Sequence, residues 1–464
     1  MLHAASATYA EMRARRRYAL TGSLENAHYG RLLIAGFATK TCVFDALSRQ
    51  RALDEYDLAV DMRDAASFVI ERFNQSFRHT GLVKRRDYNC CMIPTLLGGL
   101  SVDAFLADYW QKKPLLIRGA FPGFTGVPGL ANANDLLTMA ARNDVESRLI
   151  AGSGDDWRLD HGPFKPRALK RLVDPWTVLV QGVNLLIESG DQLLREFSFL
   201  PYARLDDLMV SYATDGGGVG PHFDSYDVFL VQGLGRRRWR IGRQKQHRLI
   251  EGLPVRILAD FRPSQEWLLE PGDMLYLPPE WAHDGVAEGE CMTWSIGFRA
   301  YPAQELAEQF LNHLQDHLEI DGRYADPALR SQKHPAEIGK DMIEQVAAQI
   351  DRIRWNRDTV KDFLGCLLTE PKPHIYFSAP ESPVSETQFA RKTRKSGIKL
   401  DIQTQLLFAG SRFFINGEAA NVPQSDRKRM SHLADRRHID STDDWSAAGA
   451  NLLYQWYRCG FISF

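Results

Sequence analysis

The chain of 464 residues is long enough for about two to four domains and a large buried core. Its 57 Lys and Arg against 58 Asp and Glu leave a formal charge of -1, so no overall basic field directs it to nucleic acid or anionic lipid. Six cysteines without a C-x-x-C pair indicate neither a disulfide framework nor a zinc knuckle, and no apolar run reaches the roughly 18 residues of a membrane span. We therefore predict a soluble protein of the reducing cytoplasm that makes no membrane contact.

Residues 1–91 mix helix-prone stretches with charged patches and carry no motif that indicates a chemistry. They are treated as an N-terminal extension of unknown role.

From Met92 to about residue 300 the chain consists of short apolar segments separated by Pro and Gly. Strands are predicted at residues 114–119, 208–213, 222–232, 236–241, 274–277 and 291–298. Many short strands joined by Gly- and Pro-rich turns favour a mainly β sandwich or jelly roll over a parallel α/β sheet.

Helical periodicity follows Tyr301. Apolar residues recur at helical spacing from Leu306 to Leu318 and from Met342 to Ile353, which predicts a helical region over residues 301–375. Such stripes are most often core, although two amphipathic helices beside a barrel would also suit a dimer interface. Residues 376–464 are predicted to form a small mixed α/β domain, with a hairpin around Asn416-Gly417 and a final helix near residues 445–457.

The pattern H-x-[DE] occurs three times, as His222-Phe223-Asp224, His317-Leu318-Glu319 and His438-Ile439-Asp440. With 13 histidines and 58 acidic residues in 464, about 1.6 matches are expected by chance, so context decides. The second pair lies on a predicted helix, where residues two apart point in different directions. The third lies in a charged stretch with no histidine after it. Only the first pair lies in a strand context.

His222 and Asp224 are two residues apart on a predicted strand, so their side chains share one face and can bind one ion. His283, which follows the short strand that ends at Pro278-Pro279, offers a third ligand from elsewhere in the barrel. Two imidazoles and one carboxylate form the facial set that holds Fe(II) and leaves positions open for an oxo acid and dioxygen. We predict that His222, Asp224 and His283 form the metal site and the catalytic centre.

The run Arg236-Arg237-Arg238-Trp239-Arg240-Ile241 alternates along a predicted strand. Arg237 shares its face with Trp239 and Ile241, which indicates an inward direction. A buried arginine needs an anion, and the distal carboxylate of 2-oxoglutarate suits its guanidinium, although an ion pair with a core carboxylate is the alternative. For Arg236, Arg238 and Arg240 a solvated strand face is favoured over contacts with ribosomal RNA.

At these residues the chain resembles a known family. The carrying segments are Gly216–Phe229 (GGGVGPHFDSYDVF), Gln232–Arg240 (QGLGRRRWR), Leu269–Pro279 (LEPGDMLYLPP) and Ser295–Arg299 (SIGFR). Through them it is similar to the JmjC-domain ribosomal oxygenases of the cupin superfamily, and most of all to the bacterial ribosomal protein arginine hydroxylases. Milder similarity covers about four fifths of the chain, from Met92 to the C-terminus.

The resemblance implies a double-stranded β-helix over residues 92–300, a helical dimerisation region over 301–375 and a winged-helix-like domain over 376–464. It implies a homodimeric Fe(II)- and 2-oxoglutarate-dependent dioxygenase, with the iron on His222, Asp224 and His283 and the cosubstrate carboxylate on Arg237. The implied substrate is an arginine of the sixteenth large-subunit ribosomal protein, hydroxylated at its β-carbon.

Two departures from the family accompany these expectations. Met92 resembles the natural family start, which makes residues 1–91 a candidate upstream extension. Thr293 stands where members can carry an asparagine near the metal, and it is expected to border the cofactor.

An arginine substrate also needs an acidic receiver, for which Asp215 at the start of the Gly-rich turn is the candidate, although Asp in this position is more often a turn former.

Two other functions stay open from the sequence. One is a metal-dependent cupin enzyme that does not use 2-oxoglutarate, and the other is a non-enzymatic protein that binds RNA or the ribosome.

Overall fold

The computed structural model describes residues 93–154, 156–169, 171–173, 175–244, 246, 248–440 and 445–464. The predicted extension over residues 1–91 lies outside the described residues. None of the described helices is long and apolar enough to cross a membrane.

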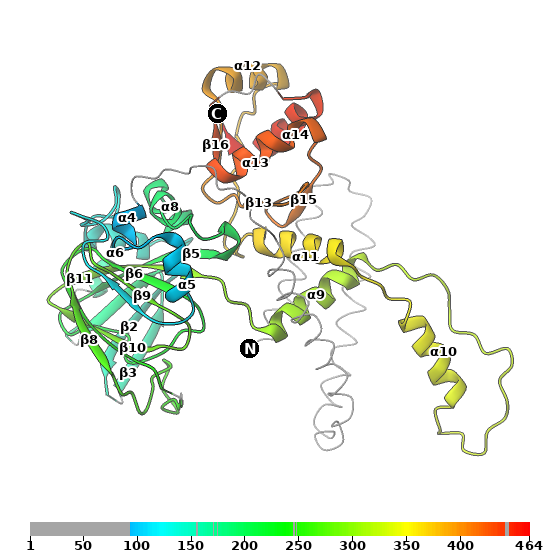
Figure 1. Ribbon diagram of the computed structural model, residues 1–464, viewed down its shortest axis with the longest axis horizontal. Coiled ribbons are helices and arrows are strands. Elements are labelled where there is room, and N and C mark those ends of the chain that lie inside the picture. Colours follow the sequence, from blue (N-terminus) through cyan, green and yellow to red (C-terminus); the bar gives the residue numbers. More distant parts are fainter. Residues whose placement is uncertain are drawn as a thin grey trace. The chain divides into compact units, whose positions relative to one another are not determined.

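Two antiparallel sheets form the first part of the described chain (Figure 1). Their strands are β1 (Leu115–Ile117), β2 (Ser147–Ser153), β3 (Asp156–His161), β4 (Trp176–Val180), β5 (Leu205–Ala213), β6 (Val228–Gln232), β7 (Arg236–Gly242), β8 (Gln265–Leu269), β9 (Met274–Leu277), β10 (Ala282–Glu288) and β11 (Cys291–Phe298). The larger sheet has the order β1-β9-β6-β11-β5-β4-β2-β3, and the smaller sheet has the order β10-β7-β8. The predicted mainly β architecture is confirmed.

The inner faces of the two sheets pack against each other. Val228 and Leu230 of β6 and Leu275 of β9 form one apolar cluster with Trp239 and Ile241 of the smaller sheet. Because side chains alternate along each strand, the neighbouring residues of β6 and β9 point to the outer face of the larger sheet. The space between the sheets is the barrel interior, and it contains the site described below.

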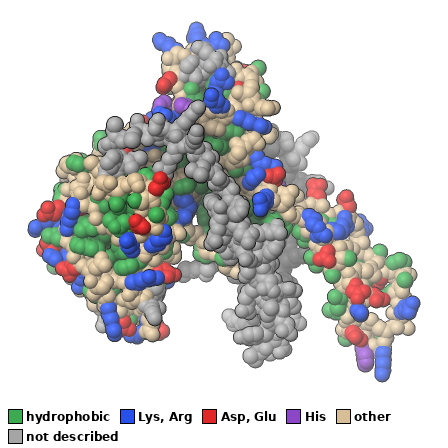
Figure 2. Space-filling view, in the orientation of Figure 1, with side chains coloured by type: hydrophobic (Ala, Val, Ile, Leu, Met, Phe, Trp, Pro, Cys, Tyr) green, Lys and Arg blue, Asp and Glu red, His purple; other side chains and the backbone are tan. Residues whose placement is uncertain are grey.

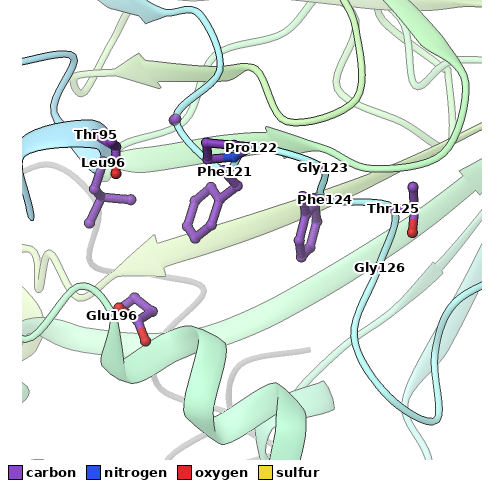
Figure 3. Close-up of a pocket in the computed structure, with 10 residues that line it drawn as sticks. Thr95, Leu96, Phe121, Pro122, Gly123, Phe124, Thr125, Gly126 and Glu196 are labelled. Atoms are coloured by element: carbon purple, nitrogen blue, oxygen red, sulfur yellow. The ribbon is translucent and has the colours of Figure 1, made fainter. Parts of the chain in front are cut away.

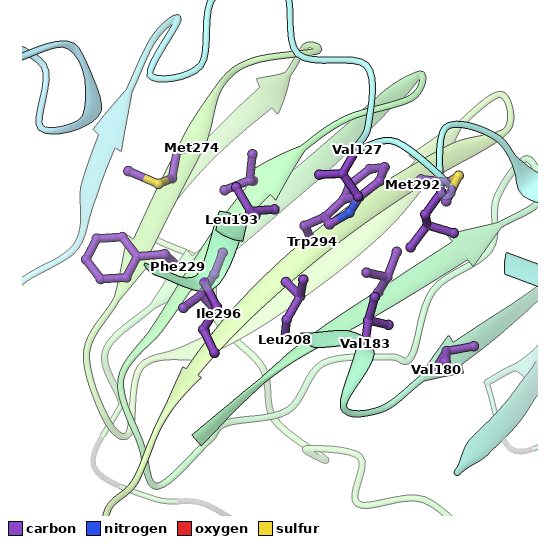
Figure 4. Packing of buried hydrophobic residues seen from close by; sticks show 14 of the residues in the cluster. Val127, Val180, Val183, Leu193, Leu208, Phe229, Met274, Met292, Trp294 and Ile296 are labelled. Carbon is purple, nitrogen blue, oxygen red and sulfur yellow. The ribbon is translucent and has the colours of Figure 1, made fainter. Parts of the chain in front are cut away.

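A second apolar core covers the outer face of the larger sheet. The helices on this side are α4 (Ile93–Leu96), α5 (Val102–Asp108), α6 (Ala133–Ala140), α7 (Pro166–Leu169) and α8 (Glu188–Arg195), with short 3-10 turns at Val183–Leu185 and Tyr202–Arg204. Figure 4 shows side chains from neighbouring strands, such as Leu208 and Ile296, in the same layer as Leu193 of α8. This core uses one set of alternating side chains and leaves the other set free to line the interior.

The predicted helical region contains α9 (Ala303–His317), α10 (Lys340–Ile350) and α11 (Arg357–Thr369). Asn356 caps α11 by accepting hydrogen bonds from the backbone N–H groups of Asp358 and Thr359. By contrast, α9 and α10 contain no buried residue.

The C-terminal part is a mixed α/β domain, as predicted. Its elements are α12 (Glu386–Ser396), β12 (Ile398–Leu400), β13 (Leu406–Ala409), β14 (Arg412–Ile415), β15 (Glu418–Ala420), a 3-10 turn at Gln424–Asp426, α13 (Arg427–Arg436), β16 (His438–Ile439), α14 (Ala447–Arg458) and β17 (Ile462–Ser463). Asn416 and Gly417 both have positive φ angles, 49° and 91°, and connect β14 to β15. Because β14 and β15 pair as antiparallel strands, the predicted hairpin is confirmed. Asn and Gly are the residues that tolerate the positive φ angles of such a turn best.

One predicted element is wrong. The strand expected over residues 222–232 is present only as β6, while residues 223–227 follow an irregular path. Within that path Asp227 is fully buried, and its carboxylate accepts hydrogen bonds from the Tyr276 hydroxyl at 2.6 Å and the Gln111 amide at 2.9 Å. These bonds to distant residues hold the segment in a conformation that its own sequence does not reveal.

Candidate metal and cosubstrate site

His222 and His283 come from segments 61 positions apart but face each other directly. The two residues exchange both backbone hydrogen bonds, from His222 N to His283 O at 2.9 Å and from His283 N to His222 O at 2.8 Å. This isolated antiparallel pair brings their imidazole centroids to 4.2 Å. Backbone pairing, rather than a long regular strand, therefore brings the two rings together.

Asp224 completes a cluster with the two histidines. Its backbone carbonyl accepts a hydrogen bond of 2.8 Å from Glu280 N, which holds the irregular segment against the turn before β10. One Asp224 carboxylate oxygen lies 3.7 Å from Nε2 of His283. One potential ligand atom from each of the three residues lies within 4.8 Å of the others, and within the described ranges this is the one group of three or more His, Cys, Asp or Glu so placed.

The two imidazoles are oriented for coordination through Nε2. Nδ1 of His222 lies 2.8 Å from the carbonyl of Gly220, and Nδ1 of His283 lies 2.9 Å from the carbonyl of Trp281. A carbonyl oxygen only accepts, so each Nδ1 carries the proton and each Nε2 presents its lone pair. Such backbone contacts fix the tautomer of metal-binding histidines.

Burial also keeps His283 neutral. Desolvation, followed by the proximity of His222, lowers the pKa of His283 to about 4, against the smaller opposing effect of Asp224. A neutral imidazole at physiological pH is the form that binds a metal ion. The chemistry of this donor set, two neutral nitrogens and one carboxylate on one side, fits Fe(II).

The two other H-x-[DE] pairs do not form such a cluster. His317 ends α9, where its Nδ1 lies 2.7 Å from the carbonyl of His313. His438 starts the short strand β16, and its Nε2 lies 3.9 Å from the carboxylate of Asp440. Neither pair has a third ligand beside it in the described residues.

Arg237 points into the barrel, as the alternation of its strand predicted. The residue is 4% exposed, whereas Arg236 is exposed and Arg238 and Arg240 are half-buried. Its Nε and Nη2 atoms are buried without a hydrogen-bond partner, and within the described part of the chain it forms no ion pair. The alternative of an ion pair with a core carboxylate therefore has no support here. An unpaired buried guanidinium fits a carboxylate ligand.

The three outward arginines of β7 are not simply solvated, which corrects that expectation. Arg238 pairs with Glu266 of β8 at 2.6 Å and with Glu288 of β10, and Arg240 pairs with Asp284 of β10. Arg236 lies 4.0 Å from Glu288. The acids of the neighbouring strands balance this basic row, so it is a cross-strand ion-pair ladder.

The two remaining predicted site residues, Thr293 and Asp215, lie on other elements. Thr293 of β11 is 1% exposed, shares the inner face with Ser295, and its hydroxyl lies 3.1 Å from the side-chain oxygen of Gln232. Asp215 is exposed in the turn after β5, and its carboxylate accepts a hydrogen bond of 2.7 Å from Gly289 N. Asp215 thus stabilises a turn, and within the described ranges it forms no ion pair with Lys or Arg.

A cavity of about 320 Å³ lies elsewhere, beside the outer core (Figure 3). Leu96, Phe121 and Phe124 line it, and Glu196 contributes its one charged side chain. Burial raises the pKa of Glu196 above its usual value. The cavity offers none of the three clustered metal-type ligands and is separate from the His222 site.

The sequence did not predict the contact between Trp239 and Gly285 in this site. They lie opposite each other on β7 and β10, and an added Cβ at Gly285 would come within 2.7 Å of the Trp239 ring. No local pattern marks Gly285, because the need for glycine arises from a side chain 46 positions earlier in the chain.

The chain is similar in sequence and fold to known proteins. The JmjC domain model matches residues 192–306, and the ROXA-like winged helix model matches residues 352–463. The Escherichia coli ribosomal protein uL16 3-hydroxylase is 32% identical over 69% of this chain and 85% of its own length, and a probable ribosomal oxygenase of Haemophilus influenzae is 41% identical over 44% and 50%. The structure of YcfD, a ribosomal oxygenase from Escherichia coli in complex with cobalt and 2-oxoglutarate, superimposes with a TM-score of 0.67 at 28% identity, covering 79% of this chain and 98% of that one.

The predicted double-stranded β-helix and winged-helix-like domain are confirmed by these matches. With its two domain types, its clustered His222, Asp224 and His283 and its extended similarity to the uL16 hydroxylase, the chain belongs to the JmjC-domain ribosomal oxygenase family.

Proposed function

We propose that this protein is an Fe(II)- and 2-oxoglutarate-dependent dioxygenase that hydroxylates the β-carbon of an arginine in the large-subunit ribosomal protein uL16. The proposal rests on one observation: a single barrel contains a cluster of two histidines and one carboxylate together with a buried arginine that has no partner in the described part of the chain. The names of the related enzymes supply the ribosomal protein and the position of the hydroxyl group.

Each site residue has a defined part in this proposal. His222, Asp224 and His283 would hold the iron through two Nε2 atoms and a carboxylate oxygen, and Arg237 would bind the distal carboxylate of 2-oxoglutarate. Bound iron supplies a centre at which the oxo acid and dioxygen react and a C–H bond is oxidised. The protein's task is to position the reactants and to exclude water from the interior. Thr293 is proposed to border the cosubstrate through its inward hydroxyl.

Asp215 is our candidate receiver for the guanidinium of the substrate. It is exposed, has no cationic partner in the described residues, and lies on the same irregular connection as His222, seven residues before it. We expect Asp215→Ala to lower kcat/KM for the substrate protein about ten- to hundredfold, the size of a lost charge-assisted hydrogen bond. Glu251→Ala, which removes another exposed acid of the same domain, should leave the rate unchanged.

The same experiment decides the role of Asp215. An unchanged rate for Asp215→Ala would leave the residue only its bond to Gly289 N.

We further propose that residues 301–375 form the interface of a homodimer. Met342, Ile343, Val346 and Ile350 form one stripe of α10 and are 37–58% exposed. Figure 2 shows hydrophobic side chains at the surface of the segment that carries α10. An apolar stripe of this kind on a helix with no buried residue is typical of an association surface.

The oligomeric state tests this interface. Val346→Glu is expected to give monomers in sedimentation velocity experiments, because it places a charge within the apolar stripe. Ala348→Glu adds the same charge to the opposite side of α10 and should leave the dimer intact. Monomeric wild-type protein at micromolar concentration would contradict the proposal.

We do not assign ribosomal RNA binding to Arg236, Arg238 and Arg240, because each of them has an acidic partner. A ribosomal protein substrate supports our proposal of a cytoplasmic location. We keep the domain limits 92–300, 301–375 and 376–464 as a proposal. The JmjC match over residues 192–306 runs six residues past the first limit, and the winged-helix match over residues 352–463 begins within the second segment.

Intact-mass spectrometry of ribosomal proteins tests the whole assignment. Cells with this gene are expected to contain uL16 heavier by one oxygen atom than cells without it, and the gene with His222→Ala should not restore that mass. An unchanged uL16 mass would exclude the proposed substrate. Formation of succinate from 2-oxoglutarate by the purified protein separates this class from cupin enzymes that do not use the cosubstrate, and its absence would exclude the class.

A further inference from the structure

The inner face of β7 carries a second unpaired donor besides Arg237. The indole Nε1 of Trp239 is buried and has no hydrogen-bond partner among the described residues. The same holds for Nε and Nη2 of Arg237, and each of the two residues is 4% exposed. Buried donors are nearly always paired in folded proteins, so three such atoms on one strand face require an explanation. An acceptor that arrives with a ligand would satisfy all three.

Trp239 lies between the unpaired guanidinium and the proposed metal ligands. Along the paired strands, Arg237 is opposite Ala287, Trp239 is opposite Gly285, and Ile241 is opposite His283. The centre of the Trp239 ring lies 5.5 Å from the Arg237 guanidinium carbon and 5.9 Å from the centre of the His283 ring. A molecule that reaches from Arg237 to the histidines therefore passes beside this indole.

Gly285 leaves the room in which the indole ring lies against β10. A Cβ at Gly285 would lie 2.7 Å from Cη2 and Cζ3 of Trp239 and 2.9 Å from Cε3. The near-equal distances to three consecutive atoms place this Cβ over the face of the six-membered ring, so the indole lies flat against the β10 backbone at Gly285 and its N–H points along the sheet. The glycine is thus required for this position of the donor.

We propose that Trp239 is a cosubstrate-binding residue, whose indole N–H donates a hydrogen bond to the carboxylate that Arg237 binds. The inference rests on the proposed use of 2-oxoglutarate and adds a second donor to that site. The indole has a fixed direction and no charge, so it selects the position of the carboxylate, while Arg237 supplies the attraction. Trp239 therefore acts on the cosubstrate and not on the metal ligands.

Calorimetric titration of the Mn(II)-loaded protein without oxygen measures this contact. Trp239→Phe keeps an aromatic ring in place and removes the N–H, and we expect about tenfold weaker binding of 2-oxoglutarate, the usual effect of losing a hydrogen bond to a charged group. Succinate keeps the distal carboxylate but lacks the oxo group, and the affinity of the variant for succinate should fall by a similar factor. The affinity for Mn(II) should stay unchanged.

Trp294→Phe is the matched control. Its Nε1 is also buried without a partner in the residues that the structure describes, but Trp294 packs into the outer core on the other side of the larger sheet. We expect it to leave the affinity for both dicarboxylates unchanged. Equal losses in the two variants would mean a general effect of tryptophan removal and would overturn the proposal, as would full affinity in Trp239→Phe.

The unmodified protein gives an independent test that needs no folded variant. In a spectrum of protein labelled with 15N-tryptophan and loaded with Zn(II), 2-oxoglutarate should shift the Trp239 indole N–H resonance downfield and leave that of Trp294 in place. An unmoved Trp239 resonance at saturating 2-oxoglutarate contradicts the inference. If the wild-type protein binds no 2-oxoglutarate at all, the proposed function fails as well, so the two failures are distinguishable.

Discussion

Replacing Arg237 should raise the stability of the ligand-free protein and lower its affinity for 2-oxoglutarate. Its Nε and Nη2 atoms are buried and have no partner among the residues with described positions, and each unsatisfied buried donor costs about 1–3 kcal/mol. Arg237→Met keeps an extended side chain and removes these donors. We therefore expect the ligand-free variant to be more stable than the wild type by about 2–6 kcal/mol for the two donors together. Each kcal/mol corresponds to roughly 2–4 °C in Tm for a domain of this size.

Ligand binding should change in the opposite direction. A bidentate guanidinium–carboxylate contact contains two charge-assisted hydrogen bonds of about 1.5–3 kcal/mol each. Arg237→Met should therefore lower the affinity for 2-oxoglutarate at least about a hundredfold. Added 2-oxoglutarate should raise the Tm of the Mn(II)-loaded wild type by mass action, and it should not raise that of the variant.

Thermal unfolding with and without 2-oxoglutarate, together with calorimetric titration, measures both effects. Arg238→Met is the control, because Arg238 lies on the outer side of the same strand and pairs with Glu266 and Glu288. It should keep full affinity for 2-oxoglutarate. If Arg237→Met lowered the stability of the ligand-free protein and bound 2-oxoglutarate normally, Arg237 would be a structural residue and the cosubstrate site would lie elsewhere.

Three further predictions concern the same domain. His222→Ala should abolish stoichiometric Mn(II) binding in equilibrium dialysis without unfolding the protein, whereas retained binding would place the metal elsewhere. The pKa of His283 is lowered to about 4 in the folded protein, so the unfolded chain binds a proton at this residue more readily. The stability of the metal-free protein should therefore fall as the pH drops from 6.5 towards 4. Tm measured against pH should show a smaller loss in His283→Gln. Asp227→Ala leaves the Tyr276 hydroxyl and the Arg204 guanidinium without their buried acceptor. It should lower the free energy of unfolding by about 3–5 kcal/mol in denaturant titrations, and Asp227→Asn should lower it less.

Regular elements could be read directly from the sequence, because their patterns are local. The alternation of Arg237 with Trp239 and Ile241 predicted an inward arginine, and the structure places that residue at 4% exposure. The pair Pro278-Pro279 predicted the end of the strand that became β9, and Asn416-Gly417 predicted a hairpin. Each of these features depends on neighbouring residues of the chain, whose geometry is set by period and by backbone preference.

The geometry of the candidate site depended on contacts between distant segments. Residues 222–232 were predicted as one strand, but the buried bonds of Asp227 and the bond from Glu280 N to Asp224 O hold residues 223–227 in an irregular path. The ion pairs of Arg238 and Arg240 likewise come from β8 and β10. Alternation indicates to which side of a strand a residue points, and it cannot indicate which strand lies beside it.

The sequence by itself thus determined the barrel class, the three candidate ligands and the inward direction of Arg237, because periodicity and spacing encode them. Only the tertiary structure decided that His222 and His283 pair through their backbones, that each ring keeps its Nε2 free, and that Gly285 makes room for Trp239. The physical reason is that hydrogen bonding and close packing join residues that are far apart along the chain, and these contacts form only when the two sheets close on each other.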